Sequence, residues 1–550
     1  MSGKTIGLDF GTTNSTITYM EDGKLEAFRY GGPDGRKYIP SFVAYEDGDL
    51  EVGLAARASA AFRTDIESYG NFKMHLPLSE SGFSIYFREE RTPSSVTIDY
   101  LREILVSSEN EYSFTQQQGE IEKLVVSVPE IWHRDARNIG RERLQKLIRE
   151  ELGFGDKLIQ LVSEPVAAAA YYAWENQFRS SQEKDKLFSG NLLVCDMGGG
   201  TFDVSLCKVR EDGSVEVLYF DGEGHSGLEC AGVAFDKYCV QSAHIKKHGK
   251  PLDEKDPKLK NLVRSFEAVK IDSHSRCTKS IKRYLSNPEK FADKTVYNFG
   301  EDYSLTNKEV SEVFEPISIG ITRVMHKIED WLKTNSQTFD RLFLVGGFCQ
   351  FSLVQQAIFD SLGIKEEDSR YDKSINIASS SYAVSFGACV IANGLISPSE
   401  QFVHEFGIEI LDPGRFKSNA GFLHSMPDKH IDLSLINGDK SLSELIEPSF
   451  GEQKLTASFS EFPLTIWVVP QSTDSKYSST INITLPNHSR EAIYQVGMRV
   501  DRSLVAHLVI KEIKSDAISE YSLGDIISKS FTNDSIETDS DRWLKFKYHE

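Results

Sequence analysis

The chain has 550 residues, of which 40% are hydrophobic, and its formal net charge is −20. Its length allows three or four domains of about 150 residues each. The negative charge and the lack of a basic run argue against a nucleic-acid partner. No apolar stretch reaches the roughly 18 residues of a membrane span, and the N-terminus lacks the apolar core of a signal peptide, so we expect no membrane attachment.

Seven cysteines lie between Cys195 and Cys389, and none forms a C-x-x-C pair. This spacing indicates neither a zinc site nor a disulfide framework. Because reduced thiols are typical of intracellular proteins, the sequence predicts a cytoplasmic protein.

The first predicted strand covers residues 6–9 and ends at Asp9. It is followed by Gly11, Thr12, Thr13 and Asn14, and then by a second strand. A glycine lets backbone N–H groups approach an anion closely, and the hydroxyl groups offer further hydrogen bonds. A carboxylate and a phosphate repel each other, so they can lie side by side only with a cation between them. This hairpin is therefore a candidate site for a phosphate and a divalent metal.

Lys73 lies before a turn-rich stretch, well after a strand predicted over residues 39–45. A single lysine is commonly a solvated surface charge. Lys73 gains a catalytic role only if it points into a phosphate site, where it could contact the terminal phosphate or the attacking water. The residues themselves leave both interpretations open.

Helices and strands alternate in the next part of the chain. Helices are predicted over residues 97–108 and 134–152, and buried strands over residues 124–128 and 158–162. Glu164 follows the second of these strands, directly before a proline and an alanine-rich helix. At this strand end Glu164 could hold a metal or orient water, or it could simply be a helix-start charge.

The hairpin design of the N-terminus recurs at residues 192–206. A buried strand ends at Asp196, and Gly199, Gly200 and Thr201 follow before the chain returns as a second strand. Asp196 could hold a metal ion through water, and Thr201 offers a hydroxyl group to a phosphate. Either segment alone could be an ordinary glycine-rich hairpin. Two of them suggest two related lobes that face each other across one nucleotide.

Two later segments offer contacts for the rest of a nucleotide. A long helix is predicted over residues 256–273, with Glu267 and Lys270 adjacent on one face. These two residues form either a surface ion pair or a ribose contact. Gly346 and Gly347 end a further buried strand, where the missing side chains allow a ligand to approach closely.

The last third of the chain differs in character. Residues 382–388 place small side chains at helical spacing, so two helices can touch there, as at a hinge between lobes. Residues 404–513 alternate apolar and polar side chains in several short strands, which predicts a β-sandwich. We expect a linker over residues 398–403 and a polar, acidic tail over residues 514–550.

Together and in this order, the motifs resemble those of the actin-like ATPases and, within that superfamily, of the seventy-kilodalton heat-shock (Hsp70) chaperones. The resemblance covers about residues 3–397. It implies an α/β, two-lobed, actin-like (ribonuclease-H-like) ATPase domain over residues 1–397, followed by a β-sandwich-like, substrate-binding domain. The tail is too short for the family's helical lid, so we expect any client groove to be open.

The resemblance also implies a role for each candidate residue. ATP or ADP would bind with Mg²⁺, with Asp9 and Asp196 beside the metal and Asp196 polarising the attacking water. Lys73, Glu164 and Thr201 would complete the catalytic group. Further nucleotide contacts would come from Gly11, Thr12, Thr13, Asn14, Gly199, Gly200, Glu267, Lys270, Gly346 and Gly347.

Four positions depart from the family pattern. The family holds adenine between two arginines, where this chain has Ile271 and Gln350, and Phe348 replaces a small polar residue. Because the cation–π contacts are lost, we expect weaker nucleotide affinity or relaxed base choice. Arg134 stands where the family carries an interdomain aspartate, which puts the coupling between domains in question.

Our first interpretation is an ATP-dependent, chaperone-like ATPase that binds unfolded or extended polypeptides on its β domain. J-domain and nucleotide-exchange co-chaperones would be further partners, and Pro129 and Arg137 resemble residues that transmit the nucleotide state. The alternative is an actin-like ATPase switch or scaffold whose β domain binds one dedicated protein. A sugar kinase ranks lower because no sugar-binding signature is found, and the retained candidate catalytic residues argue against an inactive nucleotide sensor.

Overall fold

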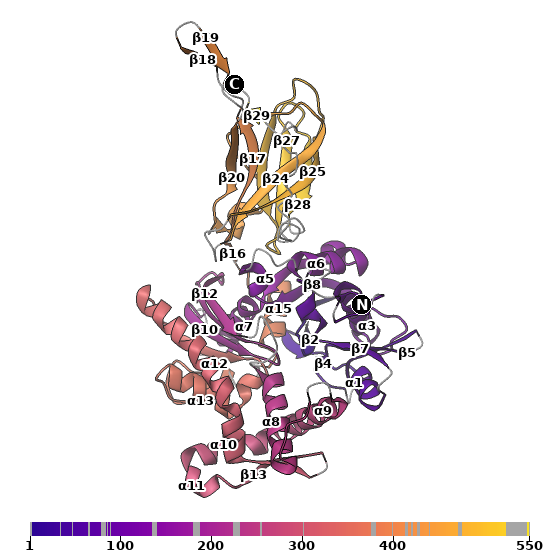
Figure 1. Ribbon diagram of the computed structural model, residues 1–550, viewed down its shortest axis with the longest axis vertical. Helices are drawn as coiled ribbons and strands as arrows, with labels where there is room; N and C mark the ends of the chain where they lie inside the picture. Colours follow the sequence, from indigo (N-terminus) through magenta and orange to yellow (C-terminus); the bar gives the residue numbers. More distant parts are fainter. Residues whose placement is uncertain are drawn as a thin grey trace. The chain divides into compact units, whose positions relative to one another are not determined.

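In this computed structural model the chain forms two compact units, each assembled from separate stretches of sequence (Figure 1). The first unit contains Met1–Lys73, Asp99–Ser127 and Ser163–Pro398. The second contains Met74–Ile98, Val128–Val162 and Ser399–Glu550. The structure describes residues 3–32, 35–46, 48–63, 66–78, 84, 86–88, 90–134, 140–179, 188–223, 231–253, 256–300, 302–375, 381–398, 400–412, 416–419, 422–425, 429–438, 440–470, 476–523 and 547–548.

Four strands follow one another in the same order in two sheets of the first unit. The first sheet contains, side by side, β3 (Lys24–Ala27), β2 (Asn14–Glu21), β1 (Lys4–Asp9) and β8 (Ile121–Val128). The second contains β12 (Val215–Glu223), β11 (Phe202–Val209), β10 (Gly190–Met197) and β15 (Arg341–Val345). In each sheet a central antiparallel hairpin is joined by a parallel strand. The two predicted hairpins are thus confirmed as strand pairs.

Two helices of the first unit touch through small residues, as the sequence predicts. They are α7 (Glu164–Arg179) and α15 (Ala383–Ala392). A Cβ atom added to Gly387 would lie 1.7 Å from the carbonyl oxygen of Ala167. On its other side α15 meets β1, where a Cβ atom on Gly7 would lie 2.2 Å from the Cys389 backbone nitrogen. Any larger side chain would force the backbones apart.

Local sequence signals set the ends of several other helices. Thr306 and Glu309 form a capping box at the start of α12, and Asp256 caps α9 just before Pro257. Further elements of the first unit are β4 (Ile39–Pro40), β5 (Phe42–Glu46), β6 (Asp49–Val52), α1 (Gly53–Phe62), β7 (Glu67–Gly70), most of α3 (Pro93–Leu105), α4 (Phe114–Gln118), α8 (Gly232–His248), α9 (Pro257–Asp272), α10 (His274–Ser286), α11 (Pro288–Phe291), β13 (Thr295–Phe299), β14 (Tyr303–Thr306), α12 (Asn307–Thr334), the short helix η4 (Phe348–Gln350) and α13 (Ser352–Ser361).

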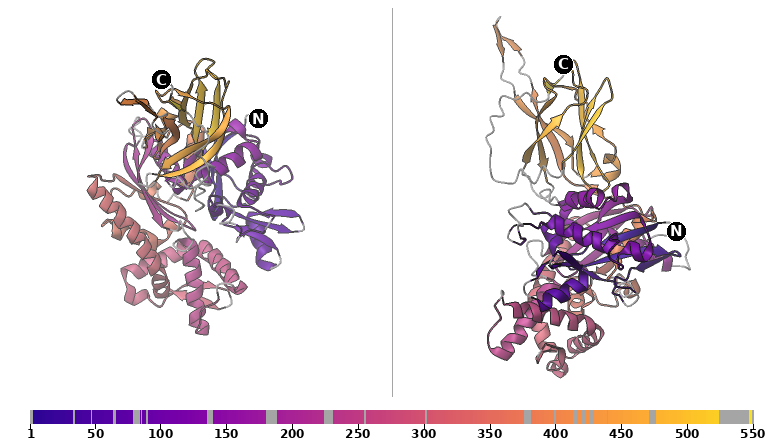
Figure 2. Two further views of the ribbon diagram at one scale, coloured as in Figure 1. Left: turned by 45° about the horizontal axis from the view of Figure 1, so that its top comes forward. Right: turned by 90° about the vertical axis from the view of Figure 1, so that its right-hand side faces the viewer.

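The strands of the second unit form a layered β structure, whose orange and yellow strands Figure 2 shows from two further sides. Their inward-facing side chains make one apolar core, which includes Ile408, Ile466, Val496 and Leu508. The longer strands are β17 (Glu405–Asp412), β20 (Lys429–Ile436), β24 (Glu461–Val469), β25 (Tyr477–Thr484), β26 (Tyr494–Val500), β27 (Ala506–Glu512) and β28 (Ile518–Ser522). The pairing of β28 with β27 continues the sheet past residue 513, into the segment expected to be a polar tail.

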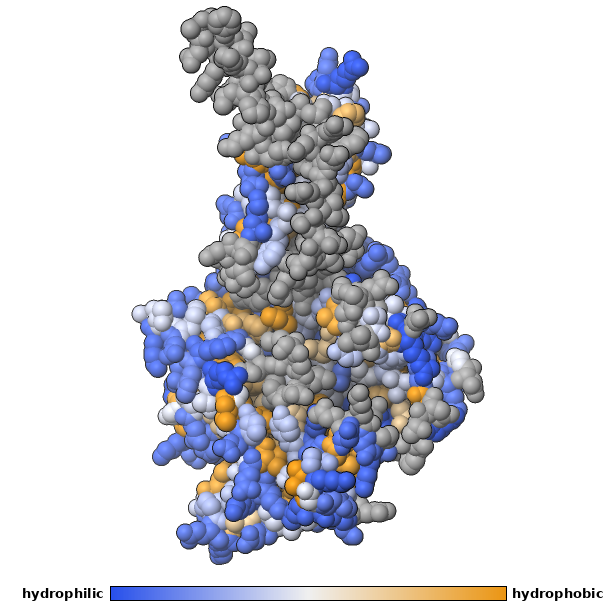
Figure 3. All heavy atoms as spheres, viewed as in Figure 1, coloured by the Kyte–Doolittle hydropathy of each residue, from blue (hydrophilic) through white to orange (hydrophobic). Residues whose placement is uncertain are grey.

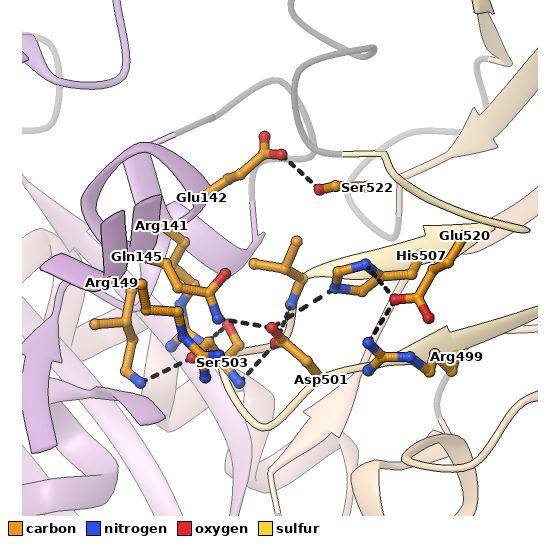
Figure 4. A network of polar contacts seen from close by, with 12 residues as sticks. Arg141, Glu142, Gln145, Arg149, Arg499, Asp501, Ser503, His507, Glu520 and Ser522 are labelled. Carbon is orange, nitrogen blue, oxygen red and sulfur yellow. Dashed lines mark hydrogen bonds and ion pairs between the residues drawn. The ribbon is translucent and has the colours of Figure 1, made fainter. Parts of the chain in front are cut away.

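The second unit also contains α5 (Ile131–Arg134), α6 (Gly140–Lys146), a π-helical turn (Leu147–Glu151) and β9 (Leu158–Ser163). Polar contacts join this segment to the β strands, as Figure 4 shows. Arg141 Nη1 donates to the Ser503 carbonyl at 2.9 Å and lies 3.5 Å from a carboxylate oxygen of Glu400. The Leu161 backbone N–H donates to Ser503 Oγ at 3.0 Å.

A partly buried aspartate, Asp501, fixes the β26–β27 turn of the same network (Figure 4). Asp501 accepts hydrogen bonds from the backbone N–H groups of Ser503 and Val505. Its other oxygen accepts from Gln145 Nε2 at 2.6 Å. These hydrogen bonds hold the turn in the shape that presents Ser503 to Arg141.

Part of the predicted linker is ordered strand. Gln401 and Phe402 form β16, which pairs with β21 (Lys440–Ser441). Trp132 and His133 of α5 are buried, and His133 Nε2 lies 2.9 Å from the Gln401 carbonyl oxygen. The segment from residue 400 to 404 is therefore built into the second unit by hydrogen bonds.

Among the described residues, apolar side chains on the face drawn in Figure 3 lie in small groups between polar ones. None of the helices in the described ranges combines the length and hydrophobicity needed to cross a lipid bilayer. Six cysteines, Cys195, Cys207, Cys239, Cys277, Cys349 and Cys389, are free and buried. The seventh, Cys230, lies outside the described residues.

Candidate functional site

The turns of the two glycine-rich hairpins meet in the first unit. A Cβ atom on Gly199 would lie 2.1 Å from Thr13 Oγ1, so only glycine allows this approach. Thr13 Oγ1 is buried and has no hydrogen-bond partner among the described residues. A buried hydroxyl group without a partner is costly, so this one fits a site completed by a ligand. The other predicted contacts of the two turns, Gly11, Thr12, Asn14, Gly200 and Thr201, flank this point in the sequence.

Hydrogen bonds from neighbouring residues to backbone carbonyl groups support the first turn. The Ser41 hydroxyl donates to the Gly11 carbonyl at 2.7 Å, and the Ser41 backbone N–H donates to the Thr13 carbonyl at 2.9 Å. Arg57 of α1 also reaches the Thr13 carbonyl, with Nη2 at 3.1 Å. The second turn is held by α8, because the Val233 N–H donates to the Gly199 carbonyl at 2.8 Å.

Lys73 is not a solvated surface charge. Only 1% of its side chain is exposed, and its Nζ atom donates to Glu164 Oε1 at 2.7 Å. The ammonium group also lies 5.7 Å from the centre of the Phe10 ring. Two residues separated widely in the sequence are thus brought together at the end of β1.

Carboxylates gather around this ion pair. Burial and the neighbouring Glu164 raise the pKa of Asp9 to about 6, although Lys73 and a 2.9 Å hydrogen bond from Ser127 act in the opposite direction. Burial, followed by the charges of Glu164, Asp203 and Asp9, raises the pKa of Asp196 well above its ordinary value. Negative charges that oppose one another in this way are relieved by a cation.

The donor set fits a magnesium ion held largely through water and phosphate oxygens. Within the described residues, no three histidine, cysteine, aspartate or glutamate side chains come close enough to bind a metal by themselves. Asp9 and Asp196 nevertheless supply the hard oxygen ligands that Mg²⁺ prefers, and Mg²⁺ usually keeps several waters. The unpartnered Thr13 hydroxyl and the glycine turns would accommodate an anion beside such an ion.

The predicted ribose residues both have partners within the protein. Lys270 Nζ donates to both carboxylate oxygens of Asp236, at 2.6 and 2.8 Å. Glu267 lies 3.4 Å from Arg57 Nη1. The two residues are therefore not paired with each other in a surface ion pair, because each contacts a different element.

The residues predicted near the base differ in their surroundings. Gly346 has a positive φ of 84°, and a Cβ atom there would lie 2.5 Å from Asp196 Oδ1, whereas a Cβ atom on Gly347 would meet nothing within 4 Å. Ile271 is 51% exposed. Phe348 is buried, and its ring packs against Phe351 with the centres 5.4 Å apart.

Sequence reasoning missed three residues of this region. Arg57, Ser127 and Asp236 contact Glu267, Asp9 and Lys270, respectively. Only Asp236 had a local signal, because it ends a glycine-rich segment. Of the residues expected to transmit the nucleotide state, Pro129 follows β8 and its carbonyl accepts from the Trp132 N–H at 3.1 Å. Arg137 lies outside the described residues, and of Arg134 only the backbone, at the end of α5, is described.

Comparison with known proteins places these features in a family. The family model described as Hsp70 protein matches residues 5–118 and 86–412. A chaperone protein DnaK of Thermus thermophilus is 27% identical over 385 residues, which are 66% of this chain and 57% of the relative. Chaperone protein DnaK of Thermotoga neapolitana is 26% identical over 399 residues, 70% of this chain and 59% of the relative.

The matched region includes both hairpins, Lys73, Glu164 and the two glycines after β15. The chain spans less than three fifths of the length of these curated relatives, at 57% and 59%. Because the family model matches well over half of the chain, the chain belongs to the Hsp70 family.

Proposed function

We propose that this chain is an ATP-dependent chaperone that hydrolyses ATP to ADP and so controls its binding of unfolded or extended polypeptides. The observation that carries the proposal is the Lys73–Glu164 ion pair of 2.7 Å, which lies beside Asp9 and Asp196. A buried lysine among carboxylates at the end of two glycine-rich hairpins is suited to phosphoryl transfer, where positioning and charge neutralisation supply most of the catalysis.

We further propose that the first unit is a two-lobed, actin-like nucleotide-binding domain. The order of four strands that its two sheets have in common supports this organisation. The proposed ATPase domain covers residues 1–397, which include the first unit, except Pro398, together with the stretches Met74–Ile98 and Val128–Val162 of the second. The other proposed limits are residues 398–403 for the linker, 404–513 for the substrate-binding β-sandwich and 514–550 for the tail. Strand β16 lies within the proposed linker, and strand β28 lies within the proposed tail. The limits of the linker and of the tail therefore mark proposed changes of function and not the ends of regular structure.

Each catalytic residue has a distinct task in this proposal. Asp196 accepts a hydrogen bond from the attacking water and orients it. Lys73, held in place by Glu164, neutralises the charge of the terminal phosphate, and Thr201 donates to that phosphate. Backbone N–H groups of the turns at Gly11–Asn14 and Gly199–Gly200 bind the phosphate oxygens. Mg²⁺, held near Asp9 and Asp196, supplies positive charge to the phosphates when it is bound.

The partners of the proposed chaperone are defined by chemistry. An extended apolar segment would bind the β strands of the second unit, and J-domain and nucleotide-exchange co-chaperones belong to the same proposal. A cytoplasmic location is also part of it, which the free, buried thiols support.

Single-turnover hydrolysis of Mg·ATP, with and without an unfolded apolar polypeptide, tests this function. We expect hydrolysis, and we expect the polypeptide to accelerate it. Lys73→Ala and Thr201→Ala should lower the rate by about 100-fold or more, because each removes a group that stabilises developing charge, and both should leave nucleotide binding largely intact. Lys282→Ala, which removes an exposed lysine paired with Glu366, is the matched control.

The outcomes separate the two interpretations. Unchanged rates in Lys73→Ala and Thr201→Ala would remove these residues from the site. Hydrolysis that ignores every polypeptide would retain the ATPase and favour a switch or scaffold with one dedicated partner.

A further inference from the structure

A second arginine, Arg264 of α9, lies near Arg57 of α1 in the first unit. Both terminal nitrogens of Arg264, Nη1 and Nη2, are buried, and neither has a hydrogen-bond partner among the described residues. A guanidinium group carries five N–H donors and keeps its charge in proteins. Two of its nitrogens shielded from water without an acceptor are costly, so an acceptor that completes them is expected.

The charges around Arg264 do not balance. Burial and the like charge of Arg57 lower the pKa of Arg264, while Glu267 acts in the opposite direction. The Glu267 carboxylate is already engaged by Arg57, whose Nη1 lies 3.4 Å from each carboxylate oxygen. In the described part of this region two guanidinium groups therefore share one carboxylate. Such an excess of positive charge attracts an anion.

The two arginines are tied to the first glycine-rich turn. Arg57 Nη2 donates to the Thr13 carbonyl at 3.1 Å, and the Ser41 backbone N–H donates to the same carbonyl at 2.9 Å. The next residue, Phe42, has the Arg264 guanidinium over its ring, with Cζ 5.7 Å from the ring centre. The unpaired nitrogens of Arg264 are thus connected with the turn that carries the unpaired Thr13 hydroxyl.

The Phe42 ring gives the Arg264 guanidinium a fixed surface. A Cβ atom on Gly70 of β7 would lie 2.9 Å from this ring, so the ring packs closely against the neighbouring strand. A ring face attracts a guanidinium and orients its plane. Two free N–H groups in a planar fork match the oxygens of a phosphate or a carboxylate.

We infer that Arg264, together with Arg57, binds a phosphate group beside the first glycine-rich turn. Arg264 supplies its two unpaired nitrogens, and Arg57 supplies the neighbouring charge. The phosphate group belongs either to the bound nucleotide or to the inorganic phosphate that hydrolysis releases, because both present the same oxygens. The first source rests on the proposed nucleotide binding, whereas the second can be measured without nucleotide. Neither arginine is among the contacts that the family resemblance implies.

A purely structural arginine makes a different prediction. In the ligand-free protein Arg264 has no hydrogen-bond partner to lose and faces a like charge. Arg264→Gln should therefore melt at the temperature of the parent or above it. A decrease of about 2 °C or more, the shift expected from about 1 kcal/mol in a large domain, would mean that Arg264 stabilises the fold and would overturn the inference.

The binding experiment uses the full chain and separates the two sources of the phosphate group. Inorganic phosphate, Mg·ADP, Mg·ATP and adenosine are titrated at one ionic strength, with potassium chloride in place of phosphate as the blank. In Arg264→Gln we expect an affinity lower by about 10- to 100-fold for the phosphate-bearing ligand, as for hydrogen bonds to charged groups. Adenosine, which carries no phosphate, should bind as it does to the parent.

The pattern of losses identifies the ligand. A loss for the nucleotides alone assigns the arginines to a nucleotide phosphate, and a loss for inorganic phosphate alone assigns them to the released product. A loss for both, with competition between them, assigns them to one site that takes either group.

Two further variants control the test. Arg264→Lys keeps the charge but not the planar fork, so it should retain only part of the affinity. It carries the test if Arg264→Gln does not fold. Arg283→Gln makes the same change at an exposed arginine of α10 and should retain all the affinities of the parent.

Three binding results would overturn the inference. They are unchanged affinities in Arg264→Gln, an equal loss for adenosine, and an effect of phosphate that chloride reproduces. If nucleotides still bind in these cases, the proposed function stands while the arginine site fails. If the parent binds phosphate through Arg264 but binds no nucleotide, the proposed function fails while the arginine site stands.

Discussion

The contact between α7 and α15 makes Gly387 the most sterically constrained position that we describe in the first unit. In Gly387→Ala the new methyl group would lie 1.7 Å from the Ala167 carbonyl oxygen, half of the 3.4 Å at which ordinary contacts begin. Because the obstacle is backbone, no side-chain rotation can relieve it. We therefore expect a loss of about 3 kcal/mol in the free energy of unfolding, the upper part of the range for overpacked sites.

Thermal and urea unfolding of the full chain measure this loss. The expected decrease in melting temperature is about 6 °C or more, from about 2 °C for each kcal/mol in a large domain. Since α7 begins at Glu164, a shift of this helix should also lower the rate of ATP hydrolysis. Gly320→Ala is the control, because Gly320 lies within α12 and a Cβ atom there meets nothing within 4 Å.

The control should behave in the opposite way. Alanine in the interior of a helix is about 1 kcal/mol more favourable than glycine, so Gly320→Ala should be slightly more stable than the parent. A melting temperature of Gly387→Ala within about 2 °C of the parent would correspond to a loss of less than about 1 kcal/mol. Such a result would show that the two helices do not approach each other as closely as described.

Three other predictions follow from the same structure. The pKa values of Asp9 and Asp236 are raised to about 6 and about 7, so the folded state binds these two protons more tightly than the unfolded state does. The two protonated carboxyl groups therefore stabilise the fold fully below about pH 4, and this stabilisation is lost as the pH rises through 6 and 7. Melting temperatures of the parent and of Asp236→Asn between pH 5 and 8 check this, and the variant should show the weaker decrease; an equal or steeper decrease would contradict it. Arg141→Met removes the cation that faces Glu400, whose side chain is only 6% exposed. The free energy of unfolding in urea should fall by about 3 kcal/mol, because a buried carboxylate loses its partner. Additive effects of Arg141→Met and Glu400→Gln would show that the two groups do not interact. Competition between ATP and GTP should show weak base selection because Ile271 carries no charge, and submicromolar ATP binding with strong rejection of GTP would refute this.

The hairpins were predictable because their signals are local. Glycines at the turns and apolar residues on the strands lie within about ten residues of Asp9 and Asp196, and the resulting strand pairs agree with the sequence analysis. The same holds for α9, whose cap at Asp256 stands next to the apolar pattern that it begins.

The partners of the site residues could not be predicted in this way. Arg57 and Glu267 are 210 positions apart, and Asp9 and Ser127 are 118 apart. No periodicity or spacing links such residues, because their contact depends on how whole sheets and helices pack. The burial of Lys73 was open for the same reason. The strand β28 was missed because it has only five residues at the edge of its sheet.

The assembly of the second unit from Met74–Ile98, Val128–Val162 and Ser399–Glu550 has a consequence for biosynthesis. Gln145 and Leu161 leave the ribosome long before Asp501 and Ser503, their hydrogen-bond partners. At about 5–20 residues per second, more than about ten seconds pass between them. During that interval Gln145 and Leu161 lack these two partners, so the hydrogen-bond network around Ser503 can form only after the strands near the end of the chain have been synthesised.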